Sequence, residues 1–290
     1  MRSWIRQSLL FAGFAAALAS GVHAQADSTE RSWNLPVEPF RIVDNIYYVG
    51  AAELGSYLIT TPAGHFLLDG GFAETAPQIL KNITKLGFKP TDVRVLLNSH
   101  GHYDHAAGLA ELKRVTGARL VVSAAERILL ESGGAKDAHF PHLTFPPVMV
   151  DSTFEDGAQL VLGGVTLTAN ITAGHTQGCT TWTMTVREAG REYGVVIDCS
   201  ISAPGYKLVN NAAYPDIIAD YEKTFARMRT FRCEVFLSAH GWFFDFANKR
   251  AAFKAEGSNN PFIDPAGCRT HIDNQEARFR KAVLDQRAAR

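Results

Sequence analysis

The feature that most constrains this chain is a dense histidine run directly after an apolar segment. The run has the pattern His-x-His-x-Asp-His and contains His100, His102, Asp104 and His105. Histidine nitrogen and aspartate oxygen are ligands that zinc accepts, and a zinc site that performs chemistry keeps one position open for water. This density of ligand-type side chains predicts a metal centre. In the alternative interpretation, Asp104 caps the helix that begins near it and the histidines are polar loop residues.

Two isolated histidines downstream extend this inventory. His175 and His240 each follow a strand-type segment, as His100 does, and strand ends are rigid platforms for metal ligands. Together with the run they could complete two sets of three ligands, which predicts a two-zinc hydrolase. Either histidine taken alone would be interpreted as structural.

The composition is that of an ordinary globular protein. The chain has 290 residues, enough for one large domain or two small ones. Its 46% hydrophobic fraction allows a substantial core. Lys plus Arg and Asp plus Glu both number 29, so the formal net charge is zero. A nucleic-acid-binding protein usually shows a basic excess, so no nucleic-acid partner is predicted.

Residues 1–24 have the pattern of a secretory signal peptide. Arg2 and Arg6 give a positive start, residues 9–18 are apolar, and Ala24 ends a small-residue stretch where cleavage is expected. The alternative is a buried N-terminal helix. No later segment is long and apolar enough to span a membrane. We therefore expect a soluble, exported mature chain of residues 25–290, periplasmic if the source is a Gram-negative bacterium.

Export changes how the four cysteines are interpreted, because oxidising compartments favour disulfides. A hairpin that pivots near Ala189 would place Cys179 opposite Cys199. Cys233 and Cys268 then remain as the second pair. The alternative, a four-cysteine zinc site, lacks any Cys-x-x-Cys spacing.

Strand-type and helical segments follow one another along the mature chain in both halves. The pattern predicts an α/β protein with two β-rich layers that helices cover on both outer sides. The strand-type segments are residues 42–49, 55–60, 65–69, 93–97, 119–123, 153–154, 159–162, 165–171, 179–186, 193–199 and 235–238. The helical segments are residues 74–86, 105–116, 124–131, 216–228 and 275–290.

Residues 133–148 differ from their surroundings, because glycines, prolines and aromatic or histidine rings dominate them. Loops of this kind often border functional sites. The alternative is a surface Ω-loop that packs on itself.

These motifs resemble the metallo-β-lactamase superfamily. The resemblance rests on the histidine run after a strand, on Asp69-Gly70-Gly71 upstream and on the later strand-end histidines. It covers about residues 43–268 and implies a single domain with an αβ/βα four-layer sandwich fold and metals at the sandwich edge. Three further segments are most similar to subclass B3 of that family: residues 174–182, 200–206 and 260–264.

The resemblance also implies roles for individual residues. One zinc would be held by His100, His102 and His175, and the other by Asp104, His105 and His240. In related hydrolases an aspartate on the strand before Ser200 bridges both metals. Ser200 aligns with that position here, as in subclass B3, where the serine is not a direct ligand. A shift in register would instead make Asp198 a bridging ligand; its other interpretation is a hydrogen-bonding residue at the strand end.

The chemistry implied by the resemblance is hydrolysis of the β-lactam amide bond by a metal-bound hydroxide, with two zinc ions per chain. Asp104 would lie near the nucleophile, Ser200 and Ser202 would hold the substrate carboxylate, and Asp69 would orient the metal-binding loop. The partner would be a small β-lactam, and we expect a monomer. Two alternatives stay open: a thioester or lactone hydrolase of the same fold, and a non-catalytic periplasmic zinc-binding protein.

Overall fold

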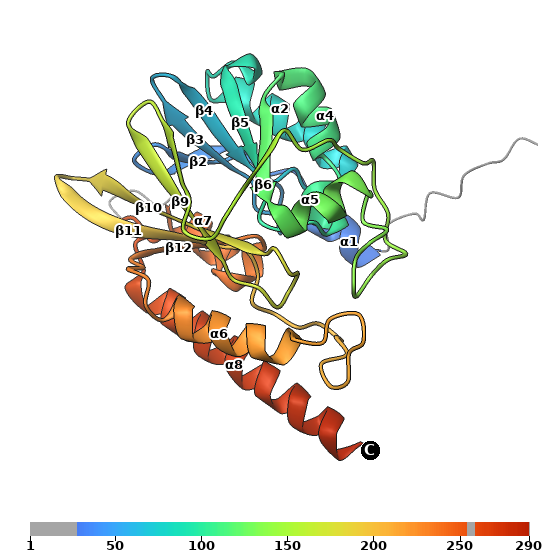
Figure 1. The fold of residues 1–290 in the computed structure, drawn as a ribbon. Helices are drawn as coiled ribbons and strands as arrows, with labels where there is room; N and C mark the ends of the chain where they lie inside the picture. The colour runs from blue at the N-terminus through green and yellow to red at the C-terminus, as the bar shows by residue number, and fades with distance from the viewer. Residues whose placement is uncertain (1–27, 254–258, 290) are drawn as a thin grey trace, which may run out of the picture.

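The fold is shown by a computed structural model, which describes residues 28–253 and 259–289 (Figure 1). The predicted signal peptide, residues 1–24, lies outside the described residues. Within the described part, no helix combines the length and the apolar character needed to cross a membrane.

The first sheet has seven strands in sequential order from β1 to β7. Pairing is antiparallel from β1 to β4 and parallel from β4 to β7. The predicted single strand 42–49 was wrong, because Asp44 has a φ of 47° and the chain turns back there. The strands are β1 Phe40–Val43, β2 Ile46–Tyr48, β3 Tyr57–Thr61, β4 Gly64–Leu68, β5 Val93–Leu97, β6 Arg119–Ser123 and β7 Ser152–Phe154.

The second sheet has five strands in the order β12-β11-β10-β9-β8. Only β11 and β12 pair in parallel in this sheet. The turn between β10 and β11 consists of Ala189 and Gly190, whose φ angles are 51° and 80°. Two positive φ angles define the tight hairpin turn that matches strand twist. The strands are β8 Gln159–Leu162, β9 Val165–Ile171, β10 Thr180–Glu188, β11 Arg191–Asp198 and β12 Val235–Ser238.

Helices cover the outer face of each sheet, which completes the predicted four-layer αβ/βα sandwich (Figure 1). The first sheet carries α2 Ala76–Lys85, α4 Leu109–Thr116 and α5 Ala124–Glu131; the second carries α6 Ile217–Met228 and α8 Pro265–Ala288. The shorter helices are α1 Ser28–Trp33, α3 Tyr103–Ala106 and α7 Phe246–Phe253, with single turns η1 Ala73–Thr75, η2 Pro90–Asp92 and η3 Gly241–Phe243.

Two helix predictions needed correction. The predicted helix 105–116 is divided into α3 and α4, because Gly108 donates its amide to Gly71 and packs directly on the backbone of Gly70. A β-carbon at Gly108 would lie 2.2 Å from the Gly70 carbonyl oxygen. The C-terminal helix begins at Pro265 rather than near residue 275, because the Asp264 side chain caps it by accepting the Gly267 amide.

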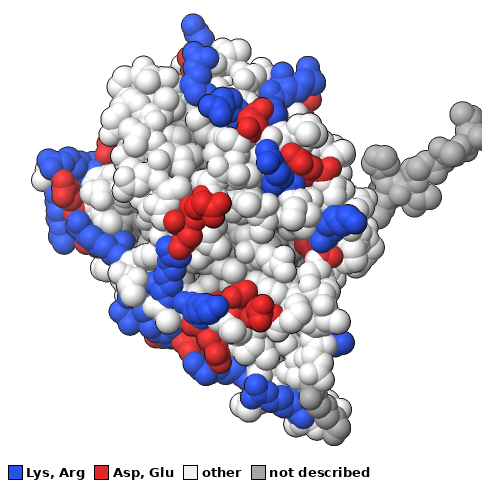
Figure 2. All heavy atoms as spheres, in the orientation of Figure 1, with Lys and Arg blue, Asp and Glu red and all other residues white. Residues whose placement is uncertain are grey.

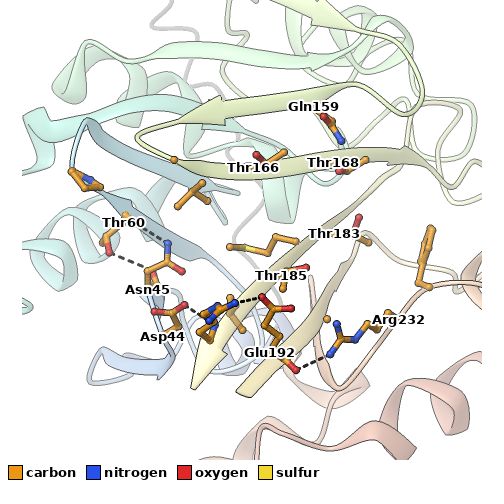
Figure 3. A pocket seen from close by; sticks show the side chains of 18 of the residues that line it. Asp44, Asn45, Thr60, Gln159, Thr166, Thr168, Thr183, Thr185, Glu192 and Arg232 are labelled. Carbon is orange, nitrogen blue, oxygen red and sulfur yellow. Dashed lines mark hydrogen bonds and ion pairs between the residues drawn. The ribbon is translucent and has the colours of Figure 1, made fainter. Parts of the chain in front are cut away.

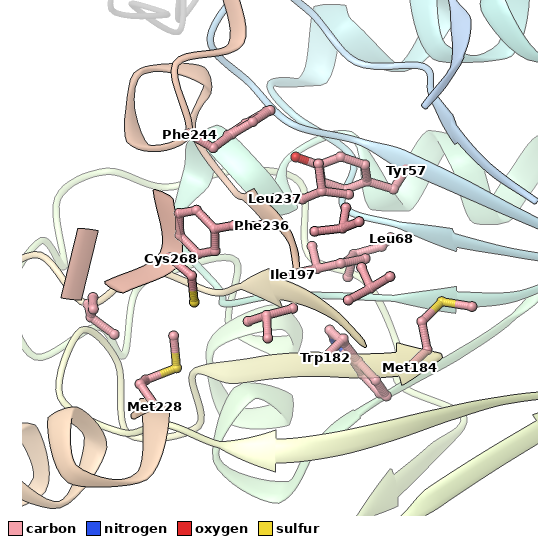
Figure 4. Packing of buried hydrophobic residues seen from close by; sticks show 14 of the residues in the cluster. Tyr57, Leu68, Trp182, Met184, Ile197, Met228, Phe236, Leu237, Phe244 and Cys268 are labelled. Carbon is pink, nitrogen blue, oxygen red and sulfur yellow. The ribbon is translucent and has the colours of Figure 1, made fainter. Parts of the chain in front are cut away.

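Two apolar layers hold the sandwich together. Between the sheets, Trp182, Ile197 and Leu237 of the second sheet face Tyr57 and Leu68 of the first (Figure 4). A separate layer joins the outer face of the first sheet to its helices; its members include Leu58, Leu67, Leu96, Ile79 and Leu112. Strand β5 contributes Leu97 to one layer and Leu96 to the other, which confirms that it is apolar on both faces.

Both predicted disulfides are present. Cys179 bonds to Cys199 with a Cα–Cα distance of 5.8 Å, and Cys233 bonds to Cys268 at 6.4 Å. The first joins the strand pair at the end opposite to the Ala189 turn. The second ties the start of β12 to α8, which fastens the outermost helix to its sheet.

Candidate metal centre

The ligand-type side chains gather at one edge of the sandwich. His100 follows β5 of the first sheet, while His175 and His240 follow β9 and β12 of the second. Asp104 and His105 lie in α3, which begins directly after His102. All six side chains predicted as ligands are buried, with exposed fractions between 0% and 8%. Burial of so many polar groups in one place costs stability unless they bind one another or an ion.

Three imidazoles form one group, called here the three-histidine cluster: His100, His102 and His175. Their ring centroids are 4.6–4.7 Å apart in all three pairs. Each ring offers a ligand nitrogen within 4.8 Å of the other two, as a shared metal ion requires.

The remaining three side chains form the aspartate cluster: Asp104, His105 and His240. The Nε2 atoms of the two histidines are 3.2 Å apart, and Asp104 Oδ2 lies 3.3 Å from one and 3.4 Å from the other. A tetrahedral zinc bound at about 2.0–2.1 Å would separate its ligand atoms by roughly 3.3–3.4 Å. The triangle therefore has the dimensions of a metal site. His100 also lies within reach of Asp104 and His105, so the two clusters adjoin.

In three of the ligand histidines, one ring nitrogen has a hydrogen-bond partner outside the clusters, which leaves the other ring nitrogen available for a metal. His175 Nδ1 donates to the Ser202 carbonyl at 2.8 Å, and His240 Nδ1 donates to the Glu53 carbonyl at 3.1 Å. His100 Nδ1 lies 3.1 Å from Ser99 Oγ, while its buried Nε2 has no partner. A partner on one ring nitrogen fixes the tautomer and directs the other nitrogen to a metal.

Electrostatics favours the forms that bind metal. Burial lowers the pKa of His100 and His175 well below the usual range and that of His240 to about 3, so these rings are neutral at pH 7. Burial opposes ionisation of Asp104, but the adjacent His105 holds the pKa of its carboxyl below the usual range. Neutral imidazoles and an ionised carboxylate are the protonation states that coordinate zinc.

Asp137 is a site residue that the sequence interpretation missed. Its Oδ2 lies 3.0 Å from His102 Nε2, and its Oδ1 accepts the amides of His139 and Phe140. Burial opposes ionisation, but these contacts lower the pKa of Asp137 to about 2. Phe140 also packs edge-on against the His102 ring. The loop 133–148 therefore borders the three-histidine cluster, as the first of its two interpretations held.

Asp69 lies beside the histidine run, as expected of a residue that orients the loop. Its Oδ1 accepts the Asn98 side-chain amide at 3.0 Å and the Ser99 backbone amide at 2.6 Å. Burial raises the pKa of this carboxyl to about 6. Asp69 holds the two residues that immediately precede His100.

The two predicted substrate-binding serines differ in accessibility. Ser200 is fully buried, whereas Ser202 is partly exposed, and their hydroxyl oxygens are 3.0 Å apart. The Ser202 carbonyl also accepts the Tyr221 hydroxyl, so this segment is held firmly next to His175. Of the two serines, only Ser202 is accessible to solvent.

Asp198 belongs to neither cluster. Its Oδ2 accepts the Ser238 hydroxyl at 3.2 Å and lies 3.3 Å from His271 Nε2 on α8. This is the strand-end hydrogen-bonding role, and the geometry gives no support to Asp198 as a bridging ligand.

Aromatic side chains line the aspartate cluster on its outer side. Trp242 stacks on the His240 ring with centroids 4.1 Å apart, and Trp33 of α1 packs against both rings. Trp242 remains 44% exposed. The position of Trp242 two residues after a strand-end histidine was a usable signal, whereas nothing in the sequence indicated that Trp33 returns to this edge.

A separate hollow lies away from both clusters. A groove of about 870 Å³ lies against the second sheet near the Ala189 turn and is lined by Thr166, Thr168, Thr183 and Thr185 (Figure 3). Its charged side chains pair with one another or with backbone groups. Hydroxyls on an uncovered sheet face are expected to be solvated, and none of the six predicted metal ligands lines this groove.

Charge on the visible face is mixed. Figure 2 shows Lys and Arg side chains next to Asp and Glu side chains without a dominant sign. This agrees with the zero formal net charge.

Comparison with known proteins places this site in a family. The model of the metallo-beta-lactamase superfamily matches residues 56–240, which is more than half of the chain. One curated relative, a probable metallo-hydrolase of Burkholderia pseudomallei strain 1710b, is 27% identical over 118 residues. That match spans 41% of this chain and only 39% of the relative.

Solved structures match over most of the chain. The FEZ-1 metallo-beta-lactamase of Legionella gormanii is 42% identical with a TM-score of 0.86, covering 88% of this chain and 98% of that one. BJP-1, a subclass B3 metallo-beta-lactamase of Bradyrhizobium japonicum, is 38% identical with a TM-score of 0.84, covering 89% and 98%. The fold, the paired clusters and the family match agree, and the chain belongs to the metallo-beta-lactamase superfamily.

Proposed function

We propose that this protein is a subclass B3-type metallo-β-lactamase, which hydrolyses the amide bond of β-lactam antibiotics with two zinc ions and thereby confers resistance. The observation that carries the proposal is the pair of adjoining buried clusters, each with three ligand atoms close enough together to share one ion. The similarity to lactamases over nearly their whole length indicates the substrate class.

The donor set fits zinc. The three-histidine cluster would hold one ion and the aspartate cluster the other, since imidazole and carboxylate are zinc ligands and each set of three leaves a position open. Paired zinc ions supply a polarised substrate carbonyl and a water that is deprotonated near neutral pH. No side chain has to be acylated in such a reaction.

The residues of this chain supply orientation and charge. Asp104, an ionised member of the aspartate cluster within reach of His100, would accept a hydrogen bond from the attacking water. The Ser202 hydroxyl would bind the substrate carboxylate. The buried Ser200 hydroxyl would orient the Ser202 hydroxyl through their mutual hydrogen bond. Trp33, Trp242 and Phe140 would shield the reacting bond from bulk water.

A bridging Asp198, together with an absence of lactam turnover, would have favoured the alternative of a thioester or lactone hydrolase. Because Asp198 contacts Ser238 and His271 instead, no observation on this chain favours that alternative. We also propose that the protein is exported to the periplasm and is a monomer. The signal-like N-terminal pattern and the two disulfides support export.

The test is hydrolysis of a chromogenic cephalosporin by the purified mature chain. We expect turnover that a chelator abolishes, that added zinc restores, and that the serine-directed inhibitor clavulanate leaves unchanged. Chelator-resistant turnover with a trapped acyl-enzyme would overturn the mechanism, and zinc binding without turnover would favour the non-catalytic alternative.

A further inference from the structure

Glu126, at the start of α5, occupies an unexpected position. The sequence Ser123-Ala124-Ala125-Glu126 has the capping-box pattern, in which the glutamate normally folds back onto its own helix start. Half of that box is present, because Ser123 Oγ accepts the Glu126 amide at 3.3 Å. The carboxylate, however, is buried with 1% exposure.

The Glu126 carboxylate lies between the two loops that carry the three-histidine cluster. Oε1 accepts a hydrogen bond from the Thr176 hydroxyl, and Thr176 directly follows His175. The other side of the carboxylate faces Gly101, between His100 and His102: a β-carbon there would lie 2.7 Å from Oε2. The two loops come from different sheets, and the start of α5 contacts both.

The helix start and both loops are in close contact. At Gly178 a β-carbon would lie 2.3 Å from Ser123 Oγ and 2.8 Å from the Glu126 amide nitrogen. Ser123 Oγ also donates to the Gly178 carbonyl at 2.9 Å. At Gly101 a β-carbon would meet Leu129 Cβ at 2.7 Å as well as the carboxylate. The helix start is thus packed tightly against both loops, which are also joined directly by the hydrogen bond from the Thr180 amide to the Ser99 carbonyl.

Burial of the Glu126 carboxylate costs folding stability. Burial raises the pKa of Glu126 to about 7, although the hydrogen bond from Thr176 opposes this shift. Oε2 has no partner with hydrogen-bond geometry. An apolar side chain of similar volume would pack here at lower cost.

We propose that Glu126 is a positioning residue that holds the His100–His102 loop and the His175 loop at the separation that the three-histidine metal site requires. It contacts no metal ligand through hydrogen bonds and acts through Gly101 and Thr176. The inference rests on the proposed function, because it presupposes a metal in the three-histidine cluster.

The experiment measures zinc binding to the full mature chain by titrating the metal-free protein against a chromophoric chelator. The variants are Glu126→Gln, which keeps one acceptor, Glu126→Leu, which keeps none, and Thr176→Val, which removes only the hydroxyl. Glu131→Gln, on the same helix, is the control for charge and stability. Each protein is also melted without metal.

We expect one of the two zinc affinities to fall by about 10–100-fold in Glu126→Leu, with Glu126→Gln between it and the parent. Thr176→Val should show a smaller loss, and combining it with Glu126→Gln should give less than the product of the single effects. In a His240→Ala background, which leaves mainly the three-histidine site, the same ranking should persist.

Unchanged affinities in all variants would overturn the proposal. So would equal weakening of both zinc sites together with a melting-temperature loss larger than that of Glu131→Gln, which would show a general structural role. If Glu126→Leu does not fold, Thr176→Val and Glu126→Gln decide the matter. A parent chain that binds no zinc would instead refute the proposed function itself.

Discussion

The two clusters at the sandwich edge are supported in different ways. The three-histidine cluster is surrounded by side chains from distant segments: Asp137 contacts His102, Tyr206 contacts His175, and Glu126 contacts the adjoining loops. In the aspartate cluster, His240 is held by a hydrogen bond from its Nδ1 to the Glu53 backbone carbonyl and by the Trp242 ring stacked on its own ring. Because side-chain partners can be removed one at a time, the first cluster can be weakened in steps without changing its ligands.

The largest expected effects separate the two clusters directly. His100→Ala should empty mainly the three-histidine site and His240→Ala mainly the other. Either change should lower kcat/KM by orders of magnitude, because nucleophile and charge stabilisation depend on paired metals. Metal analysis of each variant checks the assignment, and two zincs retained in both would contradict it.

The next effect tests side-chain support of the three-histidine cluster. Asp137→Asn removes the carboxylate beside His102, and we expect zinc affinity or activity to fall by about 10–100-fold. Asp151→Asn is the control, since Asp151 pairs with Lys113 near the end of the same long loop. Equal zinc affinities in the two variants would show that the Asp137 contact has no effect on the metal.

The disulfides should differ in what they affect. Replacing either cystine by a serine pair should cost about 2–5 kcal/mol of stability. Cys179–Cys199 lies between the His175 loop and Ser200, so its loss should also lower kcat/KM; Cys233–Cys268 anchors α8, so its loss should leave catalysis nearly unchanged. Melting curves and steady-state rates on the two double variants are the measurement. Identical steady-state rates in the two double variants would contradict a specific effect of the Cys179–Cys199 disulfide on catalysis.

The smallest effect is a pH dependence near the three-histidine cluster. Burial lowers the pKa of His139 to about 4, and its ring stacks on Tyr206 with centroids 3.6 Å apart. An unfolded histidine titrates near 6.5, so between pH 6.5 and 4 the unfolded chain binds the proton and stability falls as pH falls. His139→Phe keeps the stack, and the metal-free variant should lose less urea stability between pH 7 and 5 than the parent. An equal loss would contradict this.

Local patterns predicted much of this molecule. The histidine run identified four of the clustered side chains, and the two strand-end histidines were predicted from their position after apolar strands. The predicted hairpin brought Cys179 and Cys199 close enough to bond, although its turn is centred between Ala189 and Gly190 and the strand register is one residue away from the predicted pairing. Errors occurred at Asp44 and Gly108, where the backbone turns, and at Pro265, where the Asp264 cap starts the last helix about ten residues before the predicted position.

The supporting residues could not be predicted in the same way. Asp137 was one polar residue in a ring-rich loop, and Glu126 matched an ordinary capping box. Trp33 lay just after a signal-like segment and gave no indication of a site. Their roles depend on contacts between segments 35 or more residues apart, which local pattern does not encode.

The sequence by itself determined the chemistry of the ligands, since the side-chain types and their spacing are properties of short segments. Tertiary structure decided which atoms face the ions. Ser202 and Glu53 carbonyls from distant loops select the histidine tautomers, and α5 sets the distance between loops of two different sheets. A single fixed tautomer or inter-loop distance exists only when the sandwich has closed, because the groups that impose it lie far from the histidines along the chain.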